Sequence, residues 1–177
     1  MKVAITGYKK GLGKALYDRF RKKVGISKED WNTSDLSTLL PYLTDCDVFI
    51  NNAPSGYIQT EILYTVFEEW KDKKKTIVNI ISRSKYPNIS KGFLYSSSKA
   101  SLSHLSNSLK FISDKKCRII DVNLGLLNSE LPSLSFSEAA NLIEYVIRLP
   151  FHIEVGEISA WNTVPYSVIS KEKDKRK

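Results

Sequence analysis

The stretch that decides the fold is VAITGYKKGLGKAL, residues 3–16, close to the start of the 177-residue chain. It opens with the apolar run Val3–Thr6, continues with glycines at positions 7, 11 and 13, and passes into a helical pattern over residues 14–23. The order of strand, glycine-rich turn and helix predicts a unit whose backbone approaches a bound phosphate and whose helix begins with free N–H groups. A glycine-rich turn that binds nothing is the alternative that this stretch alone leaves open.

Outward from this unit, apolar runs alternate with helical patterns. Continuous β-branched runs predict strands at 46–53, 76–82 and 117–123, with a short strand at 24–27 and a last strand at 154–162. Apolar residues at helical spacing predict helices at 60–72, 95–113 and 137–148. This alternation predicts one α/β domain over residues 1–170, with a Rossmann-type, mostly parallel sheet and helices on both faces in three layers. Residues 171–177 are expected to form a basic, frayed tail.

Composition limits the classes of partner. The 27 basic and 19 acidic residues give a net charge of +8, which favours anionic partners such as nucleotide phosphates, nucleic acid or acidic lipid. The basic residues are dispersed and form no nucleic-acid motif, so nucleic-acid binding ranks as the last alternative. No apolar stretch reaches the roughly 18 residues of a spanning helix, and MKVAITGY lacks the apolar core of a signal peptide. We therefore expect a cytoplasmic protein with no membrane contact, no metal, and buried thiols at Cys46 and Cys117.

Several stretches, in order along the chain, resemble the short-chain dehydrogenase/reductase family, which consists of NAD(P)-dependent oxidoreductases with a Rossmann-type sheet. Two matches carry the catalytic residues: Ser82 stands thirteen residues before Tyr95, and Tyr95-x-x-x-Lys99 matches the family's YxxxK motif. The other matches are the glycine loop Thr6-Gly7-x-x-x-Gly11-x-Gly13, the pair Asp35-Leu36, the triplet Asn51-Asn52-Ala53, the turn Asn123-Leu124-Gly125, Ser129, and Val155-Gly156-Glu157-Ile158.

The pair Tyr95 and Lys99 has a direct chemical interpretation. On a helix the two side chains are neighbours on one face, so the ammonium would lie close to the phenol. A free phenol ionises only near pH 10, and a nearby cation favours its charged form. Tyr95 would then act as general acid when a carbonyl is reduced and as general base in the reverse direction, while Ser82 hydrogen-bonds the substrate oxygen. An ordinary exposed helix start is the alternative for this stretch.

The resemblance also implies a nicotinamide cofactor and the residues that contact it. The implied contacts are Thr6, Gly7, Tyr8, Lys9, Lys10, Gly11, Leu12, Gly13, Ser27, Asp35, Leu36, Asn51, Asn52, Ala53, Tyr95, Lys99, Leu124, Gly125, Leu126 and Ser129. Within this set, Asp35-Leu36 is implied at the adenine, Lys99 at the nicotinamide ribose, and Ser129 at the carboxamide. Lys9 and Lys10 favour NADP(H), since a cation near the ribose recognises its 2′-phosphate. Glu29 and Asp30 argue the other way and leave NAD(H) open.

The departures from the family pattern predict a minimal member. Asp35 stands only 22 positions after Gly13, which leaves too little chain for a full second crossover helix, and no asparagine occurs from 53 to 78 to match the family's catalytic one. The predicted function is reduction of a small carbonyl compound or oxidation of an alcohol. The alternative is a weakly active or inactive NADP(H)-binding sensor or scaffold. The resemblance also implies a homodimer or homotetramer, for which Leu102, Leu105 and Leu109 would supply an apolar stripe.

Overall fold

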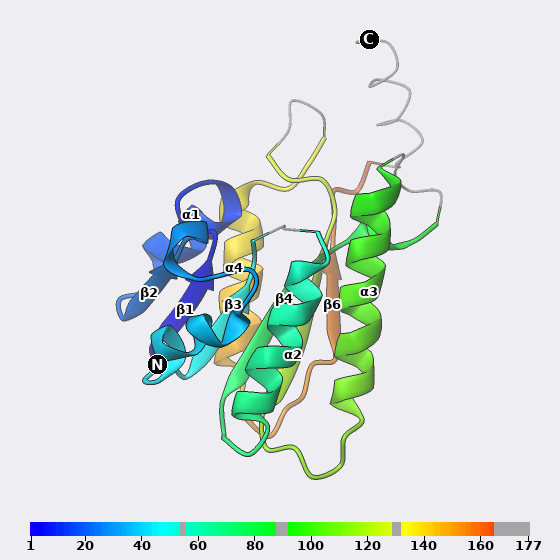
Figure 1. Ribbon diagram of the computed structural model, residues 1–177. Coiled ribbons are helices and arrows are strands. Elements are labelled where there is room, and N and C mark those ends of the chain that lie inside the picture. The colour runs from blue at the N-terminus through cyan, green and yellow to red at the C-terminus, as the bar shows by residue number, and fades with distance from the viewer. Residues whose placement is uncertain (54–55, 88–91, 129–131, 165–177) are drawn as a thin grey trace.

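The sheet has the predicted Rossmann-type organisation. The computed structural model describes residues 1–53, 56–87, 92–128 and 132–164, so the predicted tail at 171–177 lies outside the described residues. In the described part of the chain, six parallel strands stand in the order β2-β1-β3-β4-β5-β6 (Figure 1). Their bounds are β1 Val3–Thr6, β2 Lys23–Ile26, β3 Val48–Asn51, β4 Thr76–Ser82, β5 Arg118–Leu124 and β6 Glu157–Ala160.

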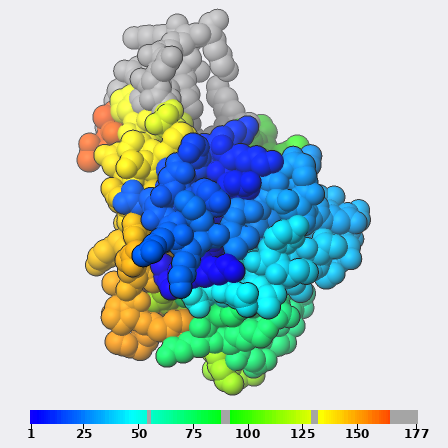
Figure 2. Space-filling model, turned by 90° about the vertical axis from the view of Figure 1, so that its left-hand side faces the viewer, coloured from blue at the N-terminus to red at the C-terminus, as the bar shows by residue number. Residues whose placement is uncertain are grey.

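Helices cover both faces of the sheet and complete the three layers. On one face α1 (Gly11–Arg19) and α4 (Phe136–Arg148) enclose a core with β1, β4 and β5 (Figure 1). On the other face α2 (Ile58–Trp70) and α3 (Phe93–Lys110) enclose a second core. The central strands are therefore buried on both sides, which explains their continuous apolar sequences. Figure 2 views the β2 edge, where the N-terminal part of the chain, in blue, forms the surface beside α4, in yellow to orange.

The topology fixes where a ligand can bind. From β1 the chain passes to β2 at the edge of the sheet, then returns across β1 to form β3 on its other side. The connections that follow β1 and β3 therefore leave the sheet in opposite directions, and a crevice opens at their carboxyl ends. The turn after β1, the starts of α1, α2 and α3, and the turn after β5 all lie at this end, the upper end in Figure 1.

The connection between β2 and β3 contains no full α-helix, as the 22-position spacing between Gly13 and Asp35 predicts. Two 3₁₀ segments occupy it, η1 (Lys28–Asp30) and η2 (Leu36–Leu43). Asp35 caps η2, since its Oδ1 accepts hydrogen bonds from the Ser37 N–H and hydroxyl. Pro41 lies inside η2, where its missing N–H disfavours regular α-helix.

One expectation about α3 is wrong. Leu102 and Leu109, expected to form an apolar stripe for another subunit, are buried in the core that α3 shares with the sheet, and Leu105 packs against that core. The helical spacing of these leucines therefore reflects packing within the chain. The most exposed apolar side chains of this region are Phe93 and Leu94 at the start of α3 and Phe111 at its end.

A row of polar side chains crosses the interior of the sheet. Asn51, Asn79 and Asp121 lie opposite one another on β3, β4 and β5, and all three are fully buried. The Asn51 amide donates to Asn79 Oδ1 over 3.2 Å, and the Asn79 amide donates to Asp121 Oδ1 over 3.0 Å. The Lys110 ammonium pairs with Asp121 Oδ2 at 2.6 Å. This polar row compensates the buried carboxylate and joins three strands at one level.

Candidate active site

A cleft of about 510 Å³ opens at the carboxyl end of the sheet. It brings together twelve residues that the sequence predicts as catalytic or cofactor-binding: Gly7, Lys10, Gly11, Leu12, Gly13, Asn52, Ala53, Ser82, Tyr95, Lys99, Leu124 and Gly125. Ile80, Ile81 and Leu127 complete the lining and were not predicted. Segments far apart in the sequence therefore meet in one concave surface, which is the usual form of a small-molecule site.

The glycine loop leaves the first turn of α1 open to the cleft. Gly7 has φ +68°, and a Cβ on Gly13 would lie 2.1 Å from the Gly7 carbonyl oxygen, so close packing requires glycine at position 13. Lys10 stands at the N-cap but provides no side-chain cap, and the Lys14 N–H makes the first bond back to Lys10. The N–H groups of residues 11–13 thus have no acceptor within the helix, which creates an anion site.

The ends of β1 and β3 are fixed to each other beside this loop. Thr6 Oγ1 accepts hydrogen bonds from the N–H groups of Asn52 and Ala53, at 2.9 and 3.1 Å. The Asn52 amide returns a bond to the Thr6 carbonyl over 3.0 Å. Thr6 is therefore placed beneath the cleft as a structural support, while Asn52 and Ala53 line it.

Near the end of β2, basic and acidic side chains are paired with each other or with neighbouring polar groups. Lys9 Nζ lies 3.0 Å from Glu29 Oε2, and Ser27 donates to Asp30 Oδ2 through both its N–H and its hydroxyl, at 2.6 Å each. The charge of Lys9 is thus partly balanced, whereas Lys10 lines the cleft without an ion-pair partner among the described residues. The lysines that favour NADP(H) and the acidic residues that favour NAD(H) are thus both present near the end of β2.

The remaining predicted cofactor residues lie outside the lining. Tyr8 packs on Gly25 of β2 and on the Tyr17 ring, Asn51 points into the polar row, and Leu36 packs against the core. The Leu126 carbonyl accepts from the Leu134 N–H. Adenine contact by Asp35 stays a prediction, since its carboxylate caps η2 away from the cleft lining. Ser129 lies outside the described residues.

Ser82, Tyr95 and Lys99 meet at the other end of the cleft. Ser82 ends β4, and its Oγ accepts hydrogen bonds from the Ser84 N–H and hydroxyl, at 3.2 and 2.9 Å. Its own hydroxyl proton is left to donate to a ligand. Tyr95 is in the first turn of α3 and 45% exposed, so its phenol is accessible from solvent. Lys99 follows one turn later, with Nζ 5.6 Å from the centre of the Tyr95 ring.

The buried ammonium of Lys99 is held by a residue that the sequence analysis missed. Lys99 is 4% exposed, and its Nζ donates to Gln59 Oε1 at 2.6 Å and to the Ile80 carbonyl at 3.0 Å. The Gln59 amide nitrogen in turn donates to the carbonyls of Asn51 and Ile80, at 2.7 and 3.2 Å. Because these carbonyls fix the amide nitrogen, the amide oxygen must face the ammonium.

One sequence signal does point to Gln59. Gln59 is the only glutamine in the chain, and it lies at the start of the helix where an asparagine was sought. Its amide oxygen is as good an acceptor as that of asparagine, but one methylene group longer. Its residue type differs from the family's asparagine, and its contact with Lys99 joins two helices, which no local spacing reveals.

The environment of Lys99 predicts a pH effect on stability. Burial lowers the pKa of this ammonium from 10.5 to about 8, so between these values the unfolded chain retains a proton that the folded chain has released. The free energy of unfolding should therefore rise with pH in this window, by on the order of 3 kcal/mol relative to Lys99→Met. Urea denaturation of both proteins from pH 7 to pH 10.5 measures it. If the difference in unfolding free energy between the two proteins does not change with pH, the lowered pKa of Lys99 is contradicted.

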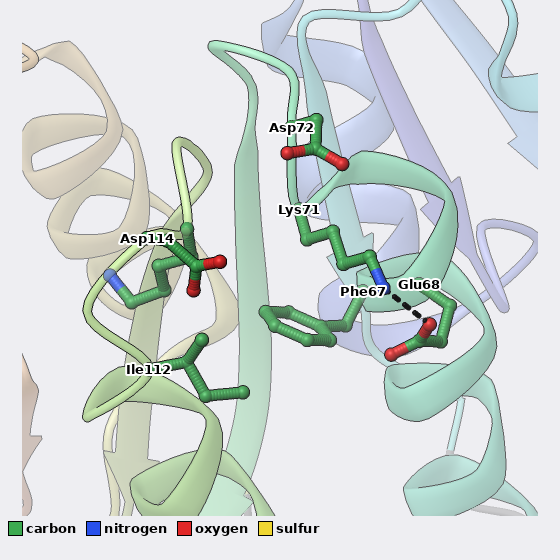
Figure 3. A pocket seen from close by; sticks show the side chains of 7 residues that line it. Phe67, Glu68, Lys71, Asp72, Ile112 and Asp114 are labelled. Atoms are coloured by element: carbon green, nitrogen blue, oxygen red, sulfur yellow. Dashed lines mark hydrogen bonds and ion pairs between the residues drawn. The ribbon is translucent and has the colours of Figure 1, made fainter.

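A second hollow, of about 260 Å³, lies at the opposite end of the sheet (Figure 3). Phe67 and Ile112 extend toward one another from α2 and from the segment after α3, and the Lys71 ammonium is paired with Glu68 at 2.8 Å. This hollow is remote from the glycine loop and from Tyr95, so it is not part of the candidate site.

In the described part of the chain, no cluster of His, Cys, Asp or Glu could hold a metal ion. Among the same residues, no helix has the length and apolar character needed to span a membrane.

The sequence matches no protein-family profile, and no curated protein is similar to it in sequence. Solved structures match over nearly the whole chain. A short chain dehydrogenase from Burkholderia cenocepacia J2315 in complex with NADP has a TM-score of 0.71 at 13% identity, covering 98% of this chain and 94% of its own. An alcohol dehydrogenase from the archaeon Thermococcus sibiricus with 5-hydroxy-NADP has a TM-score of 0.72 at 16% identity, covering 92% and 97%.

A third structure of this kind is a 3-alpha-hydroxysteroid dehydrogenase from Pseudomonas sp. B-0831 with NADH, with a TM-score of 0.72 at 15% identity over 90% of this chain and 94% of its own. These matches confirm the predicted resemblance at the level of the fold. The chain has the fold of the short-chain dehydrogenases/reductases. The bound nucleotides of these structures include both NADP and NADH, so the fold alone does not choose between them.

Proposed function

We propose that the protein is a short-chain dehydrogenase/reductase that uses NADP(H) to interconvert a carbonyl compound and an alcohol. The observation that carries the proposal is the single cleft that joins the uncapped start of α1 to Ser82, Tyr95 and Lys99. One end of this cleft offers backbone donors for phosphate, and the other offers a phenol, a hydroxyl and a buried ammonium. An anion site beside an acid–base group is what a nucleotide-dependent oxidoreductase requires.

The residues present fit a nicotinamide dinucleotide. The N–H groups of residues 11–13 would hold its pyrophosphate, and Gly13 gives the backbone the close approach that this requires. Lys10, which lines the same cleft, would contact an additional phosphate. When bound, the nicotinamide supplies or accepts the hydride.

The chain's own side chains would carry the proton chemistry. During reduction Tyr95 would donate its phenolic proton to the carbonyl oxygen, and Ser82 would donate a hydrogen bond to the same oxygen as negative charge develops. The Lys99 ammonium would stabilise the phenolate that remains, because an opposite charge favours the ionised phenol. Gln59 would act as a positioning residue, since it holds that ammonium against the sheet. The reverse sequence of proton transfers would serve alcohol oxidation.

The preference for NADP(H) rests on Lys9 and Lys10, and Glu29 should weaken it. Replacing Glu29 with glutamine releases Lys9 from its ion pair and removes a negative charge near the expected phosphate. We expect Glu29→Gln to tighten NADPH binding about threefold to tenfold while changing NADH binding little. Glu68→Gln is the matched control, because Glu68 forms a comparable exposed ion pair far from the cleft. Equal effects on NADPH and NADH would contradict the proposed position of the 2′-phosphate.

The function is tested by titrating the protein with NADPH and NADH while nicotinamide fluorescence is followed, and then by turnover of a panel of aldehydes and ketones. We expect tighter binding of NADPH and oxidation of NADPH by at least one class of carbonyl compound. If neither nucleotide binds at millimolar concentration, the proposal is overturned. Nucleotide binding without turnover of any carbonyl compound would instead identify the sensor or scaffold alternative.

A further inference from the structure

An arginine directly follows Ser82, which lines the cleft together with Tyr95. Arg83 is half-buried and begins the short 3₁₀ segment η3 (Arg83–Lys85), which packs against α3. This segment is fixed in place, since Lys85 Nζ donates to Ser103 Oγ over 3.1 Å and pairs with Glu157 of β6 at 2.5 Å. The backbone that carries Arg83 is therefore positioned by both α3 and the sheet.

The guanidinium of Arg83 lies over an aromatic ring whose residue packs against the lining of the cleft. Its central carbon lies 4.0 Å from the centre of the Trp161 ring. Trp161 follows β6 directly and packs on Gly125, where an added Cβ would lie 2.6 Å from the Trp161 Cβ. Gly125 lines the cleft. The ring occupies one side of the guanidinium, and the N–H groups of a guanidinium in such a contact can still donate hydrogen bonds to a ligand.

These N–H groups have no acidic partner. Arg19 and Arg148 both pair with Glu144, and Arg118 donates to backbone carbonyls. Within the described ranges no carboxylate lies within ion-pair distance of Arg83, and the structure gives its guanidinium no hydrogen bond. A guanidinium that rests on an aromatic ring and has no acidic partner is well suited to bind a carboxylate through two parallel hydrogen bonds.

The cofactor's phosphates would not occupy this position. The proposed pyrophosphate site follows β1, whereas Arg83 follows β4 and stacks on a residue beyond β6. Neighbouring strands are about 4.8 Å apart, so the end of β4, which precedes Arg83, lies roughly 10 Å from the end of β1, and the end of β6, which precedes Trp161, lies roughly 19 Å from it. An anion bound by Arg83 would therefore belong to the substrate, whose reacting carbon must lie near Ser82 and Tyr95.

We propose that Arg83, stacked on Trp161, binds a carboxylate of the substrate, so that the protein acts on oxo acids and the corresponding hydroxy acids. This inference rests on the proposed function. The carboxylate takes no part in the reaction: hydride adds to the ketone carbon, the proton from Tyr95 adds to its oxygen, and the acid group only orients the molecule. Arg83 is thus a specificity-determining residue beside the reacting groups.

The test compares 3-oxobutanoate and 4-oxopentanoate with their methyl esters, which have the same ketone but no negative charge. Binding is measured by ligand-observed NMR with NADP⁺ and without it, so that no turnover occurs. We expect at least one acid to bind at least tenfold more tightly than its ester to the wild type, and Arg83→Gln to abolish this difference. Arg83→Lys should retain part of it, and Arg21→Gln, which removes an exposed arginine at the amino end of β2, should retain all of it.

The outcomes separate this inference from the proposed function. Equal binding of acid and ester, binding of neither, or an unchanged difference in Arg83→Gln would each overturn the role of Arg83. If the wild type and Arg83→Gln oxidise NADPH equally well with the esters and the acids show no advantage, the oxidoreductase proposal stands and only the inference fails. If no nucleotide binds, the proposed function fails, while the binding comparison without cofactor still decides whether Arg83 recognises a carboxylate.

Discussion

Tyr95→Phe is expected to lower kcat for carbonyl reduction by about 1000-fold, because it removes the proposed proton donor and leaves the cleft otherwise intact. The substitution deletes one exposed hydroxyl and keeps the ring beside the Lys99 ammonium, so folding and NADPH affinity should change little. Steady-state kinetics with the best carbonyl substrate, together with an NADPH titration, measures both quantities.

Tyr64→Phe provides the control for this experiment. Tyr64 is exposed to a similar degree, 52% against 45% for Tyr95, but it lies on α2 and does not line the cleft. It should retain full activity. If Tyr95→Phe reduces carbonyl compounds as fast as the wild type, the phenol is not the proton donor and the proposed chemistry is wrong. Equal losses in both variants would point to a general effect of losing a surface hydroxyl.

Gln59→Leu is expected to lower kcat/KM by on the order of 100-fold and to change its pH dependence. The wild-type ammonium has a pKa of about 8, so activity that needs a charged Lys99 should fall above that pH. Leucine removes the acceptor at 2.6 Å and leaves Lys99 in an apolar environment, which lowers its pKa further. The alkaline limb of the kcat/KM profile should therefore move to lower pH.

Gln59→Glu distinguishes positioning from general structural damage. The carboxylate keeps an acceptor toward Lys99 and adds an opposite charge, so the alkaline limb should move to higher pH. Glutamate, like leucine, lacks the amide N–H groups that Gln59 donates to the carbonyls of Asn51 and Ile80. Both variants therefore carry a similar structural defect. An alkaline limb at the same pH in the wild type and in both variants would exclude Gln59 as the residue that controls the state of Lys99.

The sheet and its helices could be predicted because their signals are local. The apolar runs at 76–82 and 117–123 coincide with β4 and nearly with β5, since a strand buried on both faces is mostly apolar along its length, here with Asn79 and Asp121 as buried exceptions. The helix predicted at 137–148 differs from α4 by one residue at its start, where Ser135 and Glu138 form a capping box. Pro150 marks its end as expected.

What the sequence could not reveal depends on contacts between distant segments. Leu102 and Leu109 have the spacing of a helix face, but spacing cannot show whether the chain's own sheet or another subunit covers that face. Gln59 looks like an ordinary polar residue at a helix start until α3 brings Lys99 against it. The position of Arg83 over Trp161 joins residues 78 positions apart through the order of β4, β5 and β6, which only the assembled sheet defines.

The polar row across β3, β4 and β5 ties the position of Lys99 to the register of these strands. Because side chains alternate between the two faces, a slip of one residue would turn Asn79 or Asp121 into the apolar core on the other side. The row also reaches the start of α2, where the Asn51 amide donates to the Gln59 carbonyl. The ammonium is therefore held from below by the sheet, independently of the loops above it. Under the proposed function, substitutions in those loops can alter which molecules are accepted while the groups proposed to transfer the proton stay in place, so specificity and chemistry can evolve separately.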